Sequence, residues 1–275
     1  MLWARFVWLF ILFILGRHLC FPASPRYIEL ADSADYFIER ENWDKAEEKI
    51  IEALRLEPAN FTNSLLLANL GLVQSQKGQY EKALQSLSAG LNMAPSSTIL
   101  LNNRAHVFLA LDNIPSAIND LDRSLQIDSI QEWPLQTRAY LYLDRNEFSE
   151  ALKIFQKITK EFPNNSSAYV GMGAIAEIEE NFKDARSFYE MALSMSPDDE
   201  ETRETLIFLL IKMEDFSEAR KEIKEGLAKN PDNPMLYLLR GYLHRLNYRI
   251  EEAQADKKIA ISKGLDPSYV AKFIP

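Results

Sequence analysis

The sequence contains little cysteine, histidine and glycine, and this scarcity argues against several classes of protein. Its 275 residues include one cysteine, Cys20, so no disulfide framework can form within the chain. The histidines stand far apart, at positions 18, 106 and 244, and the nine glycines form no phosphate-binding loop. Metal-protease, paired-cysteine and nucleophile-elbow motifs are missing as well. We therefore expect no catalytic residues, no metal site, no cofactor and no small-molecule substrate.

Positive charge is also in short supply. The chain has 31 lysines and arginines against 40 aspartates and glutamates, which gives a net charge of −9. Nonspecific binding to nucleic acid requires clustered cations facing phosphates. The acidic balance therefore predicts that the partners do not include nucleic acid.

Long hydrophobic runs are missing except at the N-terminus. Phe6–Gly16 is uncharged and apolar behind Arg5, which is the pattern of a secretory signal. The run is short for a membrane span, but neighbouring apolar residues lengthen it enough for an uncleaved anchor. We expect residues 1–23 to be a signal peptide or a signal anchor, forming one hydrophobic helix. Residues 21–26 are the predicted linker to the rest of the chain.

The orientation of such an anchor is not decided by its flanking charges. Arg5 lies on one side of the run, and Arg17 and Arg26 lie on the other, so the positive-inside rule favours neither direction. The position at the extreme N-terminus is typical of export. We therefore expect the rest of the chain to be membrane-anchored or exported, on the extracytoplasmic (periplasmic) side.

The remaining sequence is organised by a repeat of 34 residues. Within Gly78–Pro95, apolar residues recur at the spacing of one helical face. Stepping from Ala83 by 34 residues reaches alanine each time, and a backward step of 37 reaches another, so the anchor alanines are Ala46, Ala83, Ala117, Ala151, Ala185, Ala219 and Ala253. Prolines follow most of these alanines by twelve residues, at Pro58, Pro95, Pro163, Pro197 and Pro231. A fixed period of this length is the signature of a solenoid.

This pattern resembles the tetratricopeptide repeat (TPR) family. Leu70-Gly71, Gly78-x-Tyr80-x-x-Ala83 and Pro95 match the family motif within one repeat. The resemblance implies an all-α superhelical solenoid, right-handed, of about seven helical hairpins within residues 27–275. The predicted repeats 1 to 7 are 27–60, 64–97, 98–131, 132–165, 166–199, 200–233 and 234–267. Ser129 replaces the closing proline of repeat 3, and Ile207 occupies a usually small position in repeat 6.

The resemblance also implies where a partner binds. In the family, the first helix of each repeat lines the concave face, through repeat positions 2, 5, 6, 9, 12 and 13. In repeats 2 to 4 this stripe mixes amides with aromatic side chains, which suit peptide backbone and hot-spot contacts. The predicted partner-binding residues are Asn69, Asn102, Asn103, His106, Trp133, Gln136, Thr137 and Tyr140. We expect alanine at both Asn103 and Tyr140 to abolish partner capture while leaving the melting temperature nearly unchanged.

Two functions remain open at this point. The chain is either a scaffold that binds a segment or helix of another protein in its groove, or a structural subunit of a cell-envelope assembly. The second would contact a folded partner through its edges or convex surface. A carboxylate-clamp adaptor is disfavoured because the lysines and arginines that should accompany Asn69 and Asn103 are missing. The opposite charges of repeat 1 (net −6) and residues 234–275 (net +3) favour head-to-tail contacts or an acidic partner.

Overall fold

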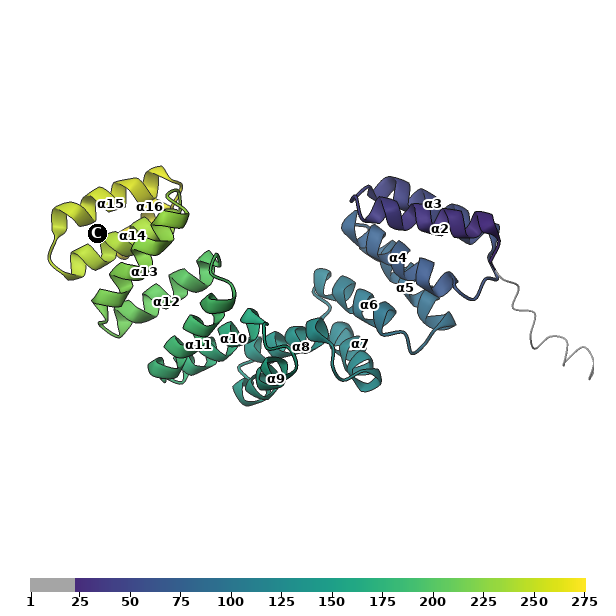
Figure 1. Cartoon of the computed structure of the whole chain (residues 1–275), viewed down its shortest axis with the longest axis horizontal. Coiled ribbons are helices and arrows are strands. Elements are labelled where there is room, and N and C mark those ends of the chain that lie inside the picture. Colours follow the sequence, from purple (N-terminus) through teal and green to yellow (C-terminus); the bar gives the residue numbers. More distant parts are fainter. Residues whose placement is uncertain (1–22) are drawn as a thin grey trace, which may run out of the picture. The chain divides into compact units, whose positions relative to one another are not determined.

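The protein is described here by a computed structural model covering residues 23–275, and every secondary-structure element in this range is a helix (Figure 1). The chain divides at Ser129/Ile130 into two compact units. Within residues 23–275, no helix is long and apolar enough to cross a membrane. The hydrophobic helix predicted for residues 1–23 lies outside the described residues, except for Ala23.

Unit 1 consists of three helical hairpins, one for each of repeats 1 to 3. Its helices are α2 (Pro25–Ile38), α3 (Trp43–Leu56), α4 (Asn63–Gln76), α5 (Tyr80–Met93), α6 (Thr98–Ala110) and α7 (Ile114–Ile127). The predicted linker is shorter than expected, because α2 begins at Pro25. Ser24 ends the linker, and its hydroxyl accepts a hydrogen bond from the amide of Tyr27 as an N-cap.

Unit 2 contains the remaining four hairpins and a short final helix. Its helices are α8 (Glu132–Asp144), α9 (Phe148–Glu161), α10 (Ser166–Ile178), α11 (Phe182–Met195), α12 (Glu200–Lys212), α13 (Phe216–Lys229), α14 (Pro234–Leu246), α15 (Ile250–Ser262) and α16 (Pro267–Ala271). Together the units contain the fourteen repeat helices expected from the period. The all-α solenoid architecture is therefore confirmed.

The anchor alanines lie in the core of their hairpins. All seven are essentially inaccessible to solvent, and each sits in the first turns of the second helix of its repeat. A methyl group there lets the first helix pack closely against the second, whereas a larger side chain would hold the helices apart. The period seen in the sequence is thus a period of close helix contact.

Glycine at repeat position 8 permits the same close contact from the other helix. A Cβ at Gly71 would lie 2.4 Å from Leu87 Cγ, and one at Gly173 would lie 2.6 Å from Tyr189 Cε1. In repeat 6, Ile207 fills this position and is fully buried. The small residue is therefore replaced by packed volume in that hairpin.

Every repeat turns between its two helices through one left-handed residue at repeat position 15. Only repeat 2 has glycine there, Gly78 with φ of 71°. The other repeats place a side chain at φ between 55° and 60°, on Glu41, Asp112, Asn146, Glu180, Glu214 and Tyr248. The following amide closes the turn; in repeat 5, the amide of Asn181 donates to the carbonyl of Ala176 at 2.8 Å.

The C-terminus covers the last hairpin, as expected. Val270 and Ile274 are fully buried against α14 and α15. The Phe273 ring contacts Tyr242 and Phe208, with centroids 5.4 and 5.7 Å away. Tyr269, Val270 and Phe273 were the predicted cover, and Ile274 adds to it. A terminal repeat requires such cover because no further repeat packs on it.

Candidate partner-binding surface

The predicted groove draws side chains from both units, and each half is described within its own unit. In unit 1, Asn69 lies on α4, and Asn102, Asn103 and His106 lie on α6. All are on the expected stripe, with His106 exposed and the three asparagines partly buried. Ala68, on the same stripe, is almost fully buried, so it belongs to the core.

The asparagines at repeat position 6 connect neighbouring repeats. Asn69 Nδ2 donates to Asp35 Oδ1 at 2.9 Å, joining α4 to α2. Asn103 Nδ2 donates to the carbonyl of Ala68 at 3.3 Å, joining α6 to α4. Each amide therefore supports the stacking of first helices with one of its two donor hydrogens. The other hydrogen and the amide oxygen remain suited to contact with a peptide backbone.

Exposed apolar side chains stand beside these amides at repeat position 2. Ile28 on α2, Leu65 on α4 and Ile99 on α6 are 48%, 56% and 54% exposed. We call these three residues the first-helix ladder, since they occupy the same position of consecutive first helices. Single exposed apolar residues are ordinary, but a repeated row is not explained by folding. The row was part of the predicted stripe, although its exposure could not be read from the sequence.

In unit 2, the predicted residues all lie on α8, the first helix of repeat 4. Trp133 is 38% exposed, and Gln136, Thr137 and Tyr140 are partly buried. Gln136 Oε1 accepts a 3.3 Å hydrogen bond from Asn165 Nδ2, which also donates to Glu132 Oε1. Gln136 therefore helps to hold the residue that caps α10.

Tyr140 is a packing residue as much as a surface residue. Its hydroxyl donates to the carbonyl of Ser167 at 2.9 Å, and its ring meets Phe155 edge-on with centroids 5.3 Å apart. Burial raises the pKa of its phenol. The expectation that Tyr140→Ala leaves the melting temperature unchanged is wrong for this reason. Loss of the bond and the ring pair costs about 2 kcal/mol of stability.

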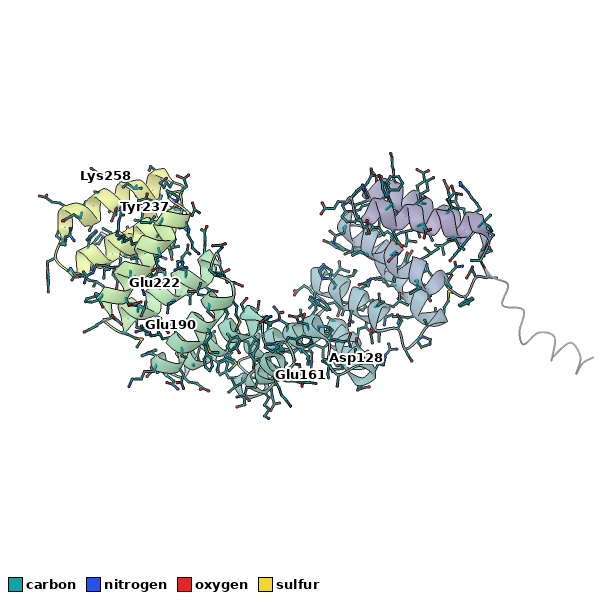
Figure 2. The ribbon with its side chains drawn as sticks, viewed as in Figure 1. Asp128, Glu161, Glu190, Glu222, Tyr237 and Lys258 are labelled. Carbon is teal, nitrogen blue, oxygen red and sulfur yellow. The ribbon has the colours of Figure 1, made fainter. Side chains whose placement is uncertain are left out.

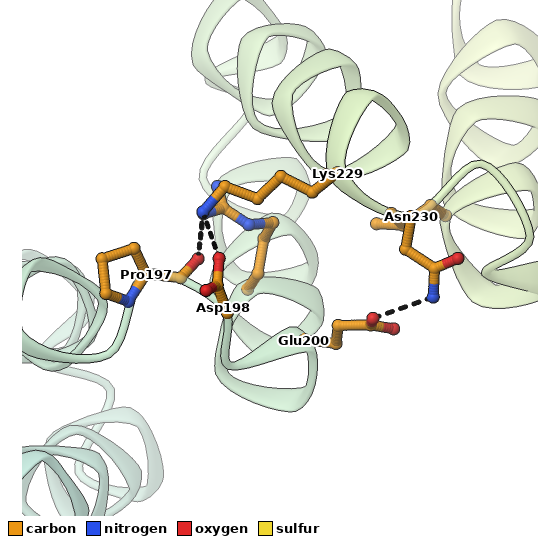
Figure 3. Close-up of a pocket in the computed structure, with 8 residues that line it drawn as sticks. Pro197, Asp198, Glu200, Lys229 and Asn230 are labelled. Atoms are coloured by element: carbon orange, nitrogen blue, oxygen red, sulfur yellow. Dashed lines mark hydrogen bonds and ion pairs between the residues drawn. The ribbon is translucent and has the colours of Figure 1, made fainter.

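A charged pocket of about 380 Å³ lies among α12, α13 and the start of α14 (Figure 3). Lys229 Nζ donates to the Pro197 carbonyl at 2.6 Å and to Asp198 Oδ1 at 2.8 Å. Asn230 Nδ2 donates to Glu200 Oε1 at 2.8 Å, and Arg203 at the wall pairs with Glu222. These polar groups bind one another across successive repeats, so the pocket is a structural junction.

Catalytic chemistry has little to work with in the described part of the chain. Residues 23–275 contain no group of three or more histidine, cysteine or acidic side chains arranged to hold a metal ion. The surface offers amides, aromatic edges and apolar side chains. Such groups bind other proteins.

Two family models match the chain. The model described as "Tetratricopeptide repeat protein 21 C-terminal ARM domain" matches residues 45–237, and the model described as "Tetratricopeptide repeat" matches residues 209–267. Together they reach from repeat 1 to repeat 7. The matches therefore cover the larger part of the chain.

Curated relatives are similar over parts of their length. A DnaJ homolog subfamily C member 7 homolog of Dictyostelium discoideum is 26% identical over 272 residues, covering 89% of this chain and 48% of that protein. Sperm-associated antigen 1 of Mus musculus is 28% identical over 114 residues, covering 42% of this chain and 12% of that protein. This chain thus spans less than half the length of either relative.

Solved structures match the architecture more completely. A tetratricopeptide repeat protein from Parabacteroides merdae has a TM-score of 0.66 and 26% identity, covering 91% of this chain and 98% of that one. YrrB, described as a TPR protein with an unusual peptide-binding site, has a TM-score of 0.55 and 17% identity, covering 68% and 96%. The Cut9–Hcn1 complex has a TM-score of 0.59 and 12% identity, covering 89% and 54%. The last two show similarity of fold alone.

Proposed function

The chain belongs to the tetratricopeptide repeat family, and from this premise we propose that it is a non-enzymatic scaffold that binds a segment of a partner protein along its first helices. Proteins of this family generally mediate protein–protein interactions, and the fold is typically a scaffold without enzymatic activity. The fold alone does not specify a partner. The proposal therefore depends on what the surface presents.

The first-helix ladder is the observation that carries this proposal. Ile28, Leu65 and Ile99 keep about half of their surface in water, and burying such side chains against a partner is favourable by about 25 cal/mol per Å². The amides of Asn69 and Asn103 lie on the same helices and supply hydrogen bonds that fix a peptide's register. An apolar row with amides beside it suits an extended segment or a helix with repeated apolar side chains.

A second apolar row supports the alternative function. Leu56, Met93 and Ile127 occupy repeat position 30 on α3, α5 and α7, and each is exposed. We call these the second-helix ladder. Second helices form the outer layer of a family solenoid, so a partner bound there would meet an edge or the convex side. This row favours a structural subunit that packs against a folded protein.

Paired variants distinguish these two functions. In affinity purification with quantitative mass spectrometry, Leu65→Ala with Ile99→Ala should deplete the specific partner. Met93→Ala with Ile127→Ala is the matched control, because it removes similar apolar area from the second helices. Circular dichroism melting should be nearly unchanged for both pairs. Partner loss only in the second pair would overturn the groove proposal and support the structural subunit.

A competing peptide gives a second test of the partner's form. A short synthetic peptide taken from the partner's cross-linked region should displace it from a groove. It should fail against a partner that docks as a folded surface. Failure of every such peptide, together with unchanged capture by the first pair, would exclude groove binding.

We further propose that residues 1–23 direct the protein to a membrane, with the repeats on the extracytoplasmic side. The support is the apolar run Phe6–Gly16 in a chain whose other apolar residues alternate with charge. Deleting residues 1–22 spares Ala23, which packs against the first core cluster. The deleted protein should leave the membrane fraction and melt like the full chain. Continued membrane fractionation would sink the proposal, and N-terminal sequencing separates a cleaved signal from an anchor.

A further inference from the structure

A second pocket, of about 450 Å³, lies between α13 of repeat 6 and α14 of repeat 7. Apolar side chains form part of its wall, namely Ile223, Leu227, Ala228 and Leu243. Arg220, Lys224, Arg240, His244, Asn247 and Arg249 supply the polar part. No aspartate or glutamate is among these lining residues. A volume of this size accommodates a large side chain and its neighbours.

This pocket lies on a different face from the ladder of the proposed groove. On α14 it uses Arg240, Leu243, His244 and Asn247, which follow the i, i+3, i+4, i+7 spacing of one helical face. The groove stripe on the same helix falls at repeat positions 2, 5, 6 and 9, which are Met235, Leu238, Leu239 and Tyr242. The pocket is therefore independent of the groove.

Two of the pocket's cations are already neutralised. Arg240 donates to both oxygens of Asp256, at 2.9 and 2.7 Å, and Asp256 lies 3.7 Å from His244 Nε2. Arg249 pairs with Glu252 at 2.7 Å. These pairs fix two guanidinium groups at the wall while their remaining N–H donors stay available.

The other two cations have no acidic partner within residues 23–275. Arg220 and Lys224 are exposed on α13, one helical turn apart, and neither forms an ion pair there. The lysines and arginines of the charged pocket in Figure 3 are bound instead to carboxylates or carbonyls. In a chain of net charge −9, an unpaired basic pair beside an apolar wall is an unusual local feature.

Tyr248 adds an exposed aromatic side chain to the same region. It lies between Asn247 and Arg249, which both line the pocket, and it is 91% exposed. Its φ of 59° is uncommon for a bulky residue. Exposed tyrosine and arginine are the types most enriched at binding hot spots.

We propose that this pocket docks an acidic segment of a partner protein, which inserts one apolar side chain. The apolar side chain would contact Ile223, Leu227 and Leu243, and carboxylates of the segment would pair with Arg220 and Lys224. Charge complementarity selects this occupant, because the described lining holds cations and no carboxylate. The site is separate from the groove and adds a second class of partner.

The probe is a fluorescein-labelled synthetic peptide in which aspartates and glutamates flank a central phenylalanine. Fluorescence anisotropy with the full-length chain in a nonionic detergent measures its affinity. Arg220→Glu with Lys224→Glu should weaken binding by at least about tenfold, because each exposed pair contributes about 0.5–1 kcal/mol and reversal adds repulsion. Ala228→Trp, at an exposed wall position, should weaken it similarly by filling the apolar space.

Lys257→Glu with Lys258→Glu is the matched control, with the same change in net charge on α15 (Figure 2 labels Lys258). It should change the affinity by less than about twofold. Replacing the peptide's phenylalanine by serine, or its acids by amides, should abolish binding. Leu65→Ala with Ile99→Ala should have no effect, which separates this site from the groove.

Equal weakening by both lysine and arginine pairs would overturn the proposal, because it would show binding to net charge alone. Absence of peptide binding would also overturn it. If the Arg220/Lys224 variant instead loses self-association in sedimentation velocity while the peptide does not bind, the occupant is the acidic repeat 1 of a second copy.

Discussion

At the residue scale, the left-handed turn residues carry a cost that a substitution can remove. Glu180 is exposed and sits at φ of 60°, where a Cβ is unfavourable. We predict that Glu180→Gly raises the free energy of unfolding by about 0.5–1 kcal/mol, since glycine adopts this conformation freely but loses more entropy on folding. Asn146→Gly should gain less, because asparagine tolerates the left-handed region. Urea denaturation checks both, and a loss of stability in Glu180→Gly would contradict the prediction.

The anchor alanines give the opposite kind of prediction. Ala151 and Ala185 are fully buried where two helices meet, so leucine at either position should overpack the hairpin. We predict a loss of about 1–3 kcal/mol for each variant. Ala228→Leu, on the exposed surface of a second helix, is the control and should change stability by less than about 0.5 kcal/mol. Equal melting temperatures for all three variants would show that the assigned repeat register is wrong.

The sequence predicted buried residues better than surface ones. Alanines at a fixed period had one explanation, close helix contact, and all seven are buried. Tyr140 had two explanations, because a tyrosine on a stripe is both a packing ring and a polar tip. Its bond to Ser167 depends on a residue 27 positions away, and helical spacing carries no information about such a contact. For the same reason, the sequence did not indicate the pocket that α13 and α14 form.

At the element scale, helix caps double as connections between repeats. Polar residues after Pro163, Pro197 and Pro231 predicted N-caps, and Asn165, Asp199 and Asn233 accept the expected amides. The sequence did not predict the second role of the asparagines. Asn233 Nδ2 donates to Glu200 and Glu204 at 2.6 and 2.7 Å, which ties the start of α14 to α12. A cap is a local signal, whereas these acceptors belong to the preceding repeat.

The same connection makes stability depend on pH. Burial raises the pKa of Glu204 above its usual value, nearby Glu200 and Glu201 raise it further, and the Asn233 bond opposes them. The folded state therefore binds this proton more tightly than the unfolded chain, and stability is lost as pH rises through the raised pKa. We predict that Glu204→Gln raises the melting temperature at about pH 7 but not at about pH 4.

Glu161→Gln, which removes an exposed carboxylate at the end of α9, is the control for the loss of one negative charge (Figure 2). Its melting temperature should follow that of the unmodified chain at both pH values. If Glu204→Gln proved equally stabilising at both, burial of the charged carboxylate would not be the cause.

At the scale of the whole molecule, the period of 34 residues predicted the number and order of the hairpins. The division into two units was not predicted, although it falls at Ser129, where repeat 3 lacks its closing proline. Each repeat buries its apolar face mainly on its neighbours, so the stability of a solenoid is a sum of local terms. A destabilised repeat should therefore affect nearby repeats most.

We predict that Ala185→Leu speeds amide hydrogen exchange in α10, α11 and α12, with a smaller change in α14 and none in α2 to α5. The cause is that overpacking in repeat 5 weakens its own hairpin and the interfaces with repeats 4 and 6, whereas repeats 1 and 2 share no interface with it. Exchange followed by mass spectrometry resolves these helices separately. A uniform increase across both units would mean that the chain unfolds as a single cooperative body, in which the repeats are not the units of stability.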